Sequence, residues 1–194
     1  LAQEAPVEAD FVMPFPDSGP YAALGYSEAS GIPFEMGLIR NHYVGRTFIQ
    51  PTQSMRDFGV RRKLNPGKNL LKGKDIIIIE DSIIRGTTVR TLVKALRELG
   101  VRKVHMRVRG PPHRFPCHYG IDFSTRGGLI AARKTVEELR EFLGLDSLYY
   151  LSIDGLLKAT EFESPETNFC KACFDGCYPV AFDKQLTKSC LESD

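Results

Sequence analysis

The stretch Ile76-Ile77-Ile78-Ile79-Glu80-Asp81-Ser82-Ile83-Ile84-Arg85-Gly86-Thr87-Thr88 decides the fold of this chain. Its isoleucine run predicts a strand that is buried on both faces, as the strands of parallel sheets are. Two carboxylates follow where the strand ends, and a Gly-Thr-Thr turn then opens a helix. Ligands of open α/β sheets bind at the carboxyl ends of strands, so we expect a binding site here.

This segment carries the hydrogen-bond donors that a sugar phosphate needs and the oxygen ligands that its metal ion needs. The amides and hydroxyls of Gly86, Thr87 and Thr88 can hold a phosphate at the positive end of the helix. Carboxylates beside a phosphate repel it unless they serve ribose hydroxyls or a magnesium ion, for which hard oxygen ligands are suited. A sugar phosphate with attached magnesium accounts for every residue, and an ordinary acidic turn between a strand and a helix is the alternative.

Strands and helices alternate along the rest of the chain. We expect strands at residues 9–15, 75–79, 102–108 and 148–151, and helices at residues 21–29, 87–99, 136–143 and 153–159. Residues 34–40 fit either a short strand or a helical turn. Residues 41–73 show no sustained period, which predicts a long flexible loop. The alternation indicates an α/β fold with a mainly parallel central sheet flanked by helices.

Composition narrows the class of protein. The chain has 194 residues, 42% of them hydrophobic, and a formal net charge of +2, which excludes a disordered chain. It has no run of 18 apolar residues, so we expect no membrane span. The start has neither an initiator Met nor a signal pattern, which favours a fragment. Nine Lys or Arg residues and one acid lie between Arg40 and Lys74, so this segment is predicted to meet an anion, with a solvated basic loop as the alternative.

The five cysteines favour thiols over disulfides. Their number is odd, and they cluster toward the carboxyl terminus, the first being Cys117. We therefore expect a reducing compartment and a cytoplasmic protein. The C-x-x-C at Cys170–Cys173 suits iron–sulfur or zinc, and free buried thiols are the alternative. No Ser/His/Asp triad is recognisable, and the four histidines lack metal-ligand spacing; we interpret His105 as a strand residue and the others as polar loop groups.

The opening segment resembles the phosphoribosyl pyrophosphate (PRPP) loop of type I phosphoribosyltransferases. Further stretches narrow the resemblance to the glutamine PRPP amidotransferase family, and together they cover about residues 1–180. These stretches are residues 16–19 with 22–26, 41–49 with 60–65, 111–122, and 170–176.

The resemblance implies a type I phosphoribosyltransferase fold and a reaction. Ammonia attacks C1 of PRPP, releasing pyrophosphate and giving phosphoribosylamine in the first step of purine synthesis. In the family a separate amino-terminal domain supplies the ammonia from glutamine, and we expect this chain to lack that domain. We therefore expect residues 1–160 to be an amino-terminally truncated phosphoribosyltransferase domain and residues 161–194 a Cys-containing tail packed on it. The resemblance also implies purine nucleotide inhibitors and a homo-oligomer in the full-length form, with no nucleic-acid or membrane partner.

The resemblance also assigns roles to single residues. Ser18, Glu80 and Asp81 reach Mg²⁺ or ribose, although the family usually has Asp where Glu80 stands. Arg46 and Lys63 meet the pyrophosphate and close over the substrate, while Tyr43 walls off the ammonia path. The PRPP-binding set comprises Asp17, Ser18, Gly19, Glu80, Asp81, Ser82, Arg85, Gly86, Thr87 and Thr88.

Cys117, Cys170 and Cys173 match cysteines that bind a [4Fe–4S] cluster in some members of the family. The fourth ligand of the family lies upstream of residue 16, and this chain has no cysteine before Cys117. We therefore expect a fragment of this length to hold a cluster poorly. Cys177 is the nearest substitute for the missing ligand.

Two other functions stay open on the sequence alone. One is a type I phosphoribosyltransferase that uses a nucleobase, against which the loop at residues 43–49 argues. The other is a non-catalytic relative that senses nucleotides or binds RNA. Such relatives often lose the acidic pair or the Gly-Thr-Thr turn, and both persist here apart from Glu80.

Overall fold

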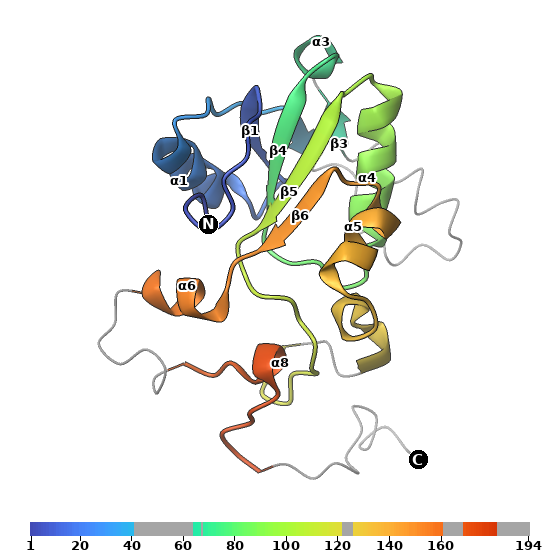
Figure 1. The fold of residues 1–194 in the computed structure, drawn as a ribbon. Helices are drawn as coiled ribbons and strands as arrows, with labels where there is room; N and C mark the ends of the chain where they lie inside the picture. Colours follow the sequence, from blue (N-terminus) through green and yellow to red (C-terminus); the bar gives the residue numbers. More distant parts are fainter. Residues whose placement is uncertain (41–63, 67, 122–125, 161–168, 182–194) are drawn as a thin grey trace.

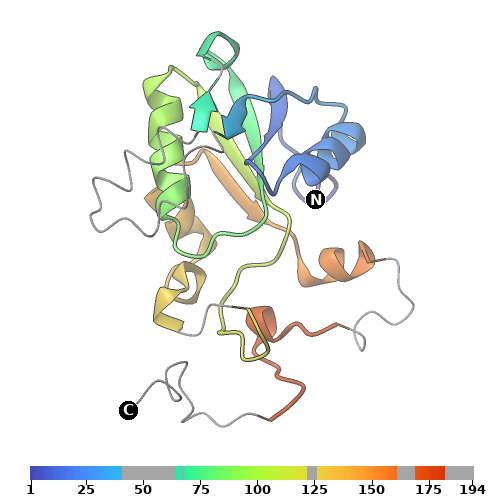
Figure 2. The same ribbon diagram turned by 180° about the vertical axis from the view of Figure 1, so that it is seen from behind.

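The computed structural model describes residues 1–40, 64–66, 68–121, 126–160 and 169–181. At its centre is a four-stranded sheet in the order β1-β4-β5-β6, in which every neighbouring pair is parallel. Helix α1 lies on one face of the sheet, and α4 and α5 lie on the other (Figures 1 and 2). The predicted α/β fold is confirmed. These elements are β1 (Phe11–Pro14), α1 (Pro20–Ser30), β4 (Asp75–Glu80), α4 (Thr87–Glu98), β5 (Lys103–Val108), α5 (Val136–Leu143) and β6 (Ser147–Tyr150).

The isoleucine run of β4 joins two hydrophobic cores. Ile76 and Ile78 belong to the larger core beneath α4 and α5, whereas Ile77 and Ile79 belong to the smaller core beneath α1. All four side chains are fully buried. Alternate side chains of a strand point to opposite faces, so a strand covered on both sides must be apolar throughout. Burying each such side chain stabilises the fold by about 1.5–3 kcal/mol.

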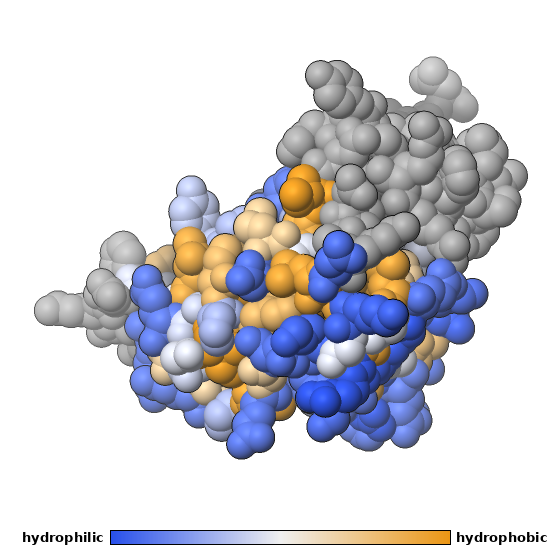
Figure 3. All heavy atoms as spheres, turned by 90° about the horizontal axis from the view of Figure 1, so that it is seen from above, coloured by the Kyte–Doolittle hydropathy of each residue, from blue (hydrophilic) through white to orange (hydrophobic). Residues whose placement is uncertain are grey.

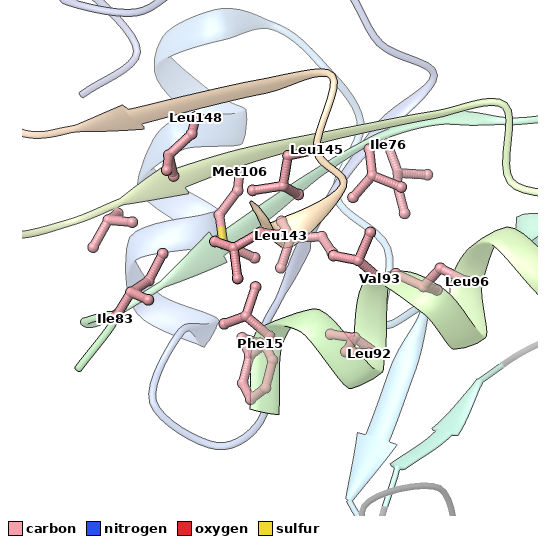
Figure 4. Packing of buried hydrophobic residues seen from close by; sticks show 14 of the residues in the cluster. Phe15, Ile76, Ile83, Leu92, Val93, Leu96, Met106, Leu143, Leu145 and Leu148 are labelled. Atoms are coloured by element: carbon pink, nitrogen blue, oxygen red, sulfur yellow. The ribbon is translucent and has the colours of Figure 1, made fainter. Parts of the chain in front are cut away.

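Helices α4 and α5 form the larger core with the sheet. Leu92, Val93 and Leu96 of α4 pack toward the strands, close to Leu143 of α5 (Figure 4). Helix α5 begins with the predicted capping box, in which Thr135 and Glu138 exchange hydrogen bonds between side chain and backbone. Both helices therefore start where local sequence predicts, and their apolar stripes face the sheet.

The prediction that residues 41–73 lack regular structure is wrong for the carboxyl-terminal part of that range. Strand β3 (Leu64–Pro66) pairs antiparallel with β2 (Leu38–Arg40), and a short helix α3 (Lys68–Leu71) follows. Pairing between segments that residues 41–63 separate leaves no local period. Leu71 is fully buried in the larger core. The rest of the expected flexible loop, residues 41–63, lies outside the described residues.

The described part of the tail, residues 169–181, contacts the loop after β5. Helix α6 (Ile153–Lys158) follows β6, and α8 (Ala172–Asp175) lies against the loop after β5. The carbonyl of Cys173 accepts hydrogen bonds from the amides of Arg114 and Phe115, at 3.0 and 3.1 Å. Figure 1 shows α8 and this loop below the carboxyl ends of the strands. None of the helices in the described part is long and apolar enough to cross a membrane.

Charged pairs neutralise the amino ends of the strands. The Asp75 carboxylate accepts two hydrogen bonds from Arg102, at 2.6 and 2.8 Å, and Asp10 pairs with Lys74 at 3.0 Å. Viewed from this side, hydrophilic residues predominate, with apolar ones between them (Figure 3). The hydrogen bond from Arg102 lowers the pKa of Asp75.

Replacing Asp75 with Asn should lower the melting temperature by about 2–4 °C at neutral pH, because the ion pair with Arg102 is lost. A lowered pKa stabilises the fold above the ordinary value of 3.8, and this contribution disappears as the pH falls through the folded value. The difference between wild type and variant should therefore shrink below about pH 4. Glu137→Gln, which removes an exposed pair with Arg140, is the control and should change the melting temperature little. A difference that stayed constant with pH would contradict this assignment.

Candidate functional site

The loops after β1 and β4 meet at the carboxyl edge of the sheet. They meet because β1 pairs with β4 in a register that places Pro14 opposite Ile79. The amide of Phe15 then donates to the Ile79 carbonyl at 2.8 Å. Ser18 Oγ donates to Glu80 Oε1 at 3.5 Å, so a residue predicted for the pyrophosphate side lies beside the acidic pair.

Only glycine fits at position 19. A Cβ atom there would lie 2.5 Å from the Ile79 carbonyl oxygen and 2.9 Å from the Phe15 amide nitrogen. Both atoms belong to backbone, which cannot move aside without breaking the sheet edge. The preceding Pro16–Asp17 peptide bond is cis. Because a Cβ atom at residue 19 would collide with this backbone, the close approach of residues 15–19 to β4 depends on glycine at that position.

The two carboxylates occupy different environments. Glu80 is 5% exposed, whereas Asp81 is half-buried. Burial, followed by the hydrogen bond and charge of Asp81, raises the pKa of Glu80 to about 9. Partial burial raises the pKa of Asp81, but hydrogen bonds from Glu80 and two serines outweigh it and hold the value below normal. Without a metal, the pair thus shares one proton, which Glu80 carries.

The turn after the acidic pair leads into a helix whose start has no capping side chain. Gly86 precedes α4 with φ +76°, and a Cβ there would lie 3.2 Å from Ile130 and 3.3 Å from Leu143. No side chain at this position caps the first turn. Thr87 and Thr88 are exposed, as is Arg85. Amides at a helix start that lack a capping side chain are available to a phosphate.

The described residues include all ten predicted PRPP contacts. They lie on two loops, residues 17–19 after β1 and residues 80–88 at the end of β4 and the start of α4. Ser18, Glu80, Asp81 and Ser82 are linked by hydrogen bonds, while Asp17 is exposed. The predicted Arg46, Lys63 and Tyr43 lie outside the described residues.

The acidic pair suits magnesium better than the cysteines suit a cluster. Ser18, Glu80 and Asp81 supply hard oxygen donors at one edge, and phosphate oxygens of a ligand can complete the coordination. Among the cysteines, burial raises the pKa of Cys173 to about 11, and the charges of Cys117 and Cys170 add to the rise, so the three thiols share a neighbourhood. Within the described part of the chain, however, no three His, Cys, Asp or Glu side chains are close enough to hold a metal ion. The thiols as placed do not fit a cluster.

One polar residue close to the site was not predicted from the sequence. His113, interpreted as a polar loop group, is partly buried near Asp81: burial lowers the pKa of His113, and the Asp81 carboxylate raises it in part. No motif identifies this residue, because it is 32 positions from Asp81 and lies in the loop that follows β5, the strand paired with β4. A polar residue in the loop after the neighbouring strand was the only available signal.

Replacing Glu80 with Gln should stabilise the metal-free protein increasingly as the pH rises. Folded Glu80 stays protonated to about pH 9, whereas the unfolded chain ionises it near its ordinary pKa of 4.5. The wild type therefore loses stability between these values, and Gln keeps the hydrogen bonds without ionising. Urea unfolding in a chelator should give the variant an advantage of at least about 1 kcal/mol near pH 8, and less near pH 5.

The matched control is Glu35→Gln, which changes an exposed carboxylate. Its effect on the free energy of unfolding should not grow over the same pH range. A destabilised Glu80→Gln variant at neutral pH would show that Glu80 is ionised in the folded protein.

Comparisons with known proteins find close relatives of this chain. The chain is 56% identical over 191 residues to an amidophosphoribosyltransferase of Synechococcus elongatus, covering 98% of this chain and 38% of that protein. It is 53% identical over 180 residues to a chloroplastic amidophosphoribosyltransferase of Arabidopsis thaliana, covering 93% of this chain and 31% of that protein. A scan against protein-family models found no match.

A solved structure agrees in fold as well. The glutamine PRPP amidotransferase of B. subtilis, complexed with ADP and GMP, superposes with a TM-score of 0.84 at 49% identity, over 95% of this chain and 41% of that one. The predicted type I phosphoribosyltransferase fold is thereby confirmed. The chain thus spans about two fifths or less of the length of these relatives. In sequence and in fold, this chain is similar to one part of the amidophosphoribosyltransferases.

Proposed function

We propose that this chain binds PRPP with magnesium and transfers ammonia to its C1, giving 5-phosphoribosylamine and pyrophosphate. The observation that carries the proposal is the edge shared by the loops after β1 and β4. There the hydrogen-bonded Ser18–Glu80–Asp81 group is followed, on the same loop, by the open start of α4. A phosphate site next to an acidic pair matches a ligand that carries phosphates, ribose hydroxyls and magnesium.

Each part of the site has one task in this proposal. The exposed Thr87 and Thr88, with the Gly86 turn, bind the 5′-phosphate, because the helix start offers amides and a positive dipole. Asp81 and Glu80 bind ribose hydroxyls or the metal. Residues 17–19 bind the pyrophosphate from the opposite side. The remaining predicted residues, Arg46, Lys63 and Tyr43, are proposed to close over the ligand.

The reaction forms a C–N bond and breaks a C–O bond at C1. Pyrophosphate leaves with the electron pair of the broken bond, and positive charge develops on the ribose ring. Magnesium, when bound, supplies charge neutralisation for the leaving pyrophosphate. The carboxylates near the ribose stabilise the developing positive charge, and exclusion of water protects it from hydrolysis.

The names of the matched relatives favour this reaction over the two alternatives. Both curated proteins are amidophosphoribosyltransferases, so neither transfer to a nucleobase nor a non-catalytic role has specific support. We further propose residues 1–160 as the transferase domain and residues 161–194 as its tail. Glutamine as the ammonia source, purine nucleotides as inhibitors and a homo-oligomer belong to the same proposal for the longer protein.

Asp81→Asn should weaken magnesium-dependent PRPP binding about tenfold or more, because a neutral amide is a poorer ligand for magnesium and for ribose hydroxyls. Isothermal titration calorimetry in the presence of magnesium measures this loss. Asp154→Asn, an exposed change in the first turn of α6, is the control and should bind normally. Unchanged PRPP affinity in the Asp81 variant would refute the site. Pyrophosphate release with ammonium salts then tests the reaction itself.

We also propose that Cys117, Cys170 and Cys173 bind a [4Fe–4S] cluster in the longer protein. Support comes from the shared neighbourhood of the three thiols and from the C-x-x-C spacing. The thiols as described would have to move together, and a fourth ligand is needed. Iron and sulfide analysis after anaerobic purification should find less than a full cluster in this chain. A stable complement of four irons that survives Cys177→Ser would contradict this ligand count.

A further inference from the structure

An aromatic ring of α5 lies beside the turn that opens α4. The two helices cover the same face of the sheet (Figures 1 and 2). A Cβ atom at Gly86 of the turn would lie 3.7 Å from the Phe142 ring. Phe142 is half-buried and packs against the larger core, which fixes its position. The ring therefore lies next to the turn to which the proposed function assigns the 5′-phosphate.

Two cations lie over this same ring. The guanidinium carbon of Arg90 is 4.7 Å from the centroid of the Phe142 ring, and the ammonium nitrogen of Lys134 is 5.6 Å from it. Both distances are in the range at which an aromatic ring attracts a cation. Arg90 is exposed and Lys134 is partly exposed, so both charges stay in contact with solvent. A single ring thus holds two positive charges beside the start of α4.

The backbone ties both cations to the turn. The Arg90 amide donates to the Gly86 carbonyl at 2.9 Å, and long helical side chains point back toward the start of their helix. Lys134 belongs to a segment bound just before the turn. The amide of Ile130 donates to the Ile84 carbonyl at 2.8 Å, and the amide of Lys134 donates to the Ile130 carbonyl at 3.0 Å. The two charges therefore approach the turn from two different segments.

Neither charge is neutralised by an acid in the described part of the chain. Arg90 and Lys134 form no ion pair with any described carboxylate. Glu138, in the first turn of α5, uses its carboxylate in the capping box with Thr135. Both positive charges are thus available to an anion bound at the start of α4.

We propose that Phe142 is a positioning residue of the PRPP site, and that the Arg90 and Lys134 cations it holds strengthen binding of the doubly charged 5′-phosphate. This inference rests on the proposed function and adds three side chains to it. Exposed charges interact over roughly 8–10 Å in moderate salt. Phe142 lies against the turn and against both cations, which keeps the charges at this range. The cations act through solvent, while the ring acts only through the cations.

The first test removes one charge at a time. Arg90→Gln should weaken magnesium-dependent PRPP binding about 3-fold at low ionic strength, and the loss should shrink in high salt, which screens exposed charges. Arg90→Lys keeps the charge and should retain most of the affinity. Lys94→Gln is the matched control, because Lys94 is an exposed cation one turn farther along α4. It should bind like the wild type.

A double-mutant cycle tests the positioning role of the ring. Phe142→Leu keeps an apolar side chain and should weaken PRPP binding about 3-fold, whereas Phe142→Tyr keeps the ring and should bind like the wild type. Combined with Arg90→Gln, Phe142→Leu should cost less than it does alone, because the ring acts through the cations. Additive losses would overturn this role. Circular dichroism melts of every variant separate these effects from unfolding, and affinities are compared per folded protein.

Two fragments of the ligand locate the effect at one end of it. Ribose 5-phosphate carries the 5′-phosphate alone, and it should compete with PRPP less well in Arg90→Gln and Lys134→Gln than in the wild type. Competition by pyrophosphate with magnesium should stay unchanged in the same variants. Equal losses for both fragments would show a general effect of net charge and would overturn the assignment to the 5′-phosphate.

The outcomes distinguish the two proposals. If the wild type shows no magnesium-dependent PRPP binding, the proposed function fails. If the wild type binds and Asp81→Asn does not, but Arg90→Gln, Lys134→Gln and Phe142→Leu all bind like the wild type, then the function stands and the role of the ring and its cations is refuted.

Discussion

The parallel pairing of β1 with β4 is the constraint on which the site depends. Its register places the end of β1 opposite Ile79, so the following loop arrives beside Glu80. The pairing requires β4 to lie inside the sheet with both faces covered, and the isoleucine run satisfies this requirement. Gly19 then allows the loop to approach the strand end more closely than any other residue would. The same burial that stabilises the sheet therefore brings the loops after β1 and β4 together.

The amino ends and the carboxyl ends of the strands differ in how their charged side chains are paired. At the amino ends, Asp75 and Asp10 are matched with basic partners within hydrogen-bonding distance. At the carboxyl ends, Glu80 is buried next to another carboxylate, and the start of α4 has no capping side chain at Gly86. A buried acid and an open helix start both cost stability in the free protein. A metal ion beside the buried acid and a phosphate at the helix start would offset these two costs. The electrostatics of this end of the sheet therefore favour a ligand that carries both.

Local chemistry was sufficient to predict much of the molecule. The period of α4, the capping box of α5 and the apolar run of β4 all depend on neighbours within a few residues. The acidic pair and its glycine turn were likewise recognisable, because their chemistry lies within one continuous segment. The pairing of β2 with β3 escaped prediction, since its hydrogen bonds join segments separated by the long basic stretch.

The sequence by itself determined the alternation of strands and helices and the position of the acidic pair and the Gly-Thr-Thr turn that follows it. Only the tertiary structure decided that Glu80 is the protonated member of the pair, because its pKa depends on burial by segments distant in sequence. It also decided that the ring of His113 packs edge-on against that of Phe174. The physical reason is the same in both cases. Hydrogen-bond patterns and side-chain periods are local, whereas burial and the distances between charges arise only when strands pair.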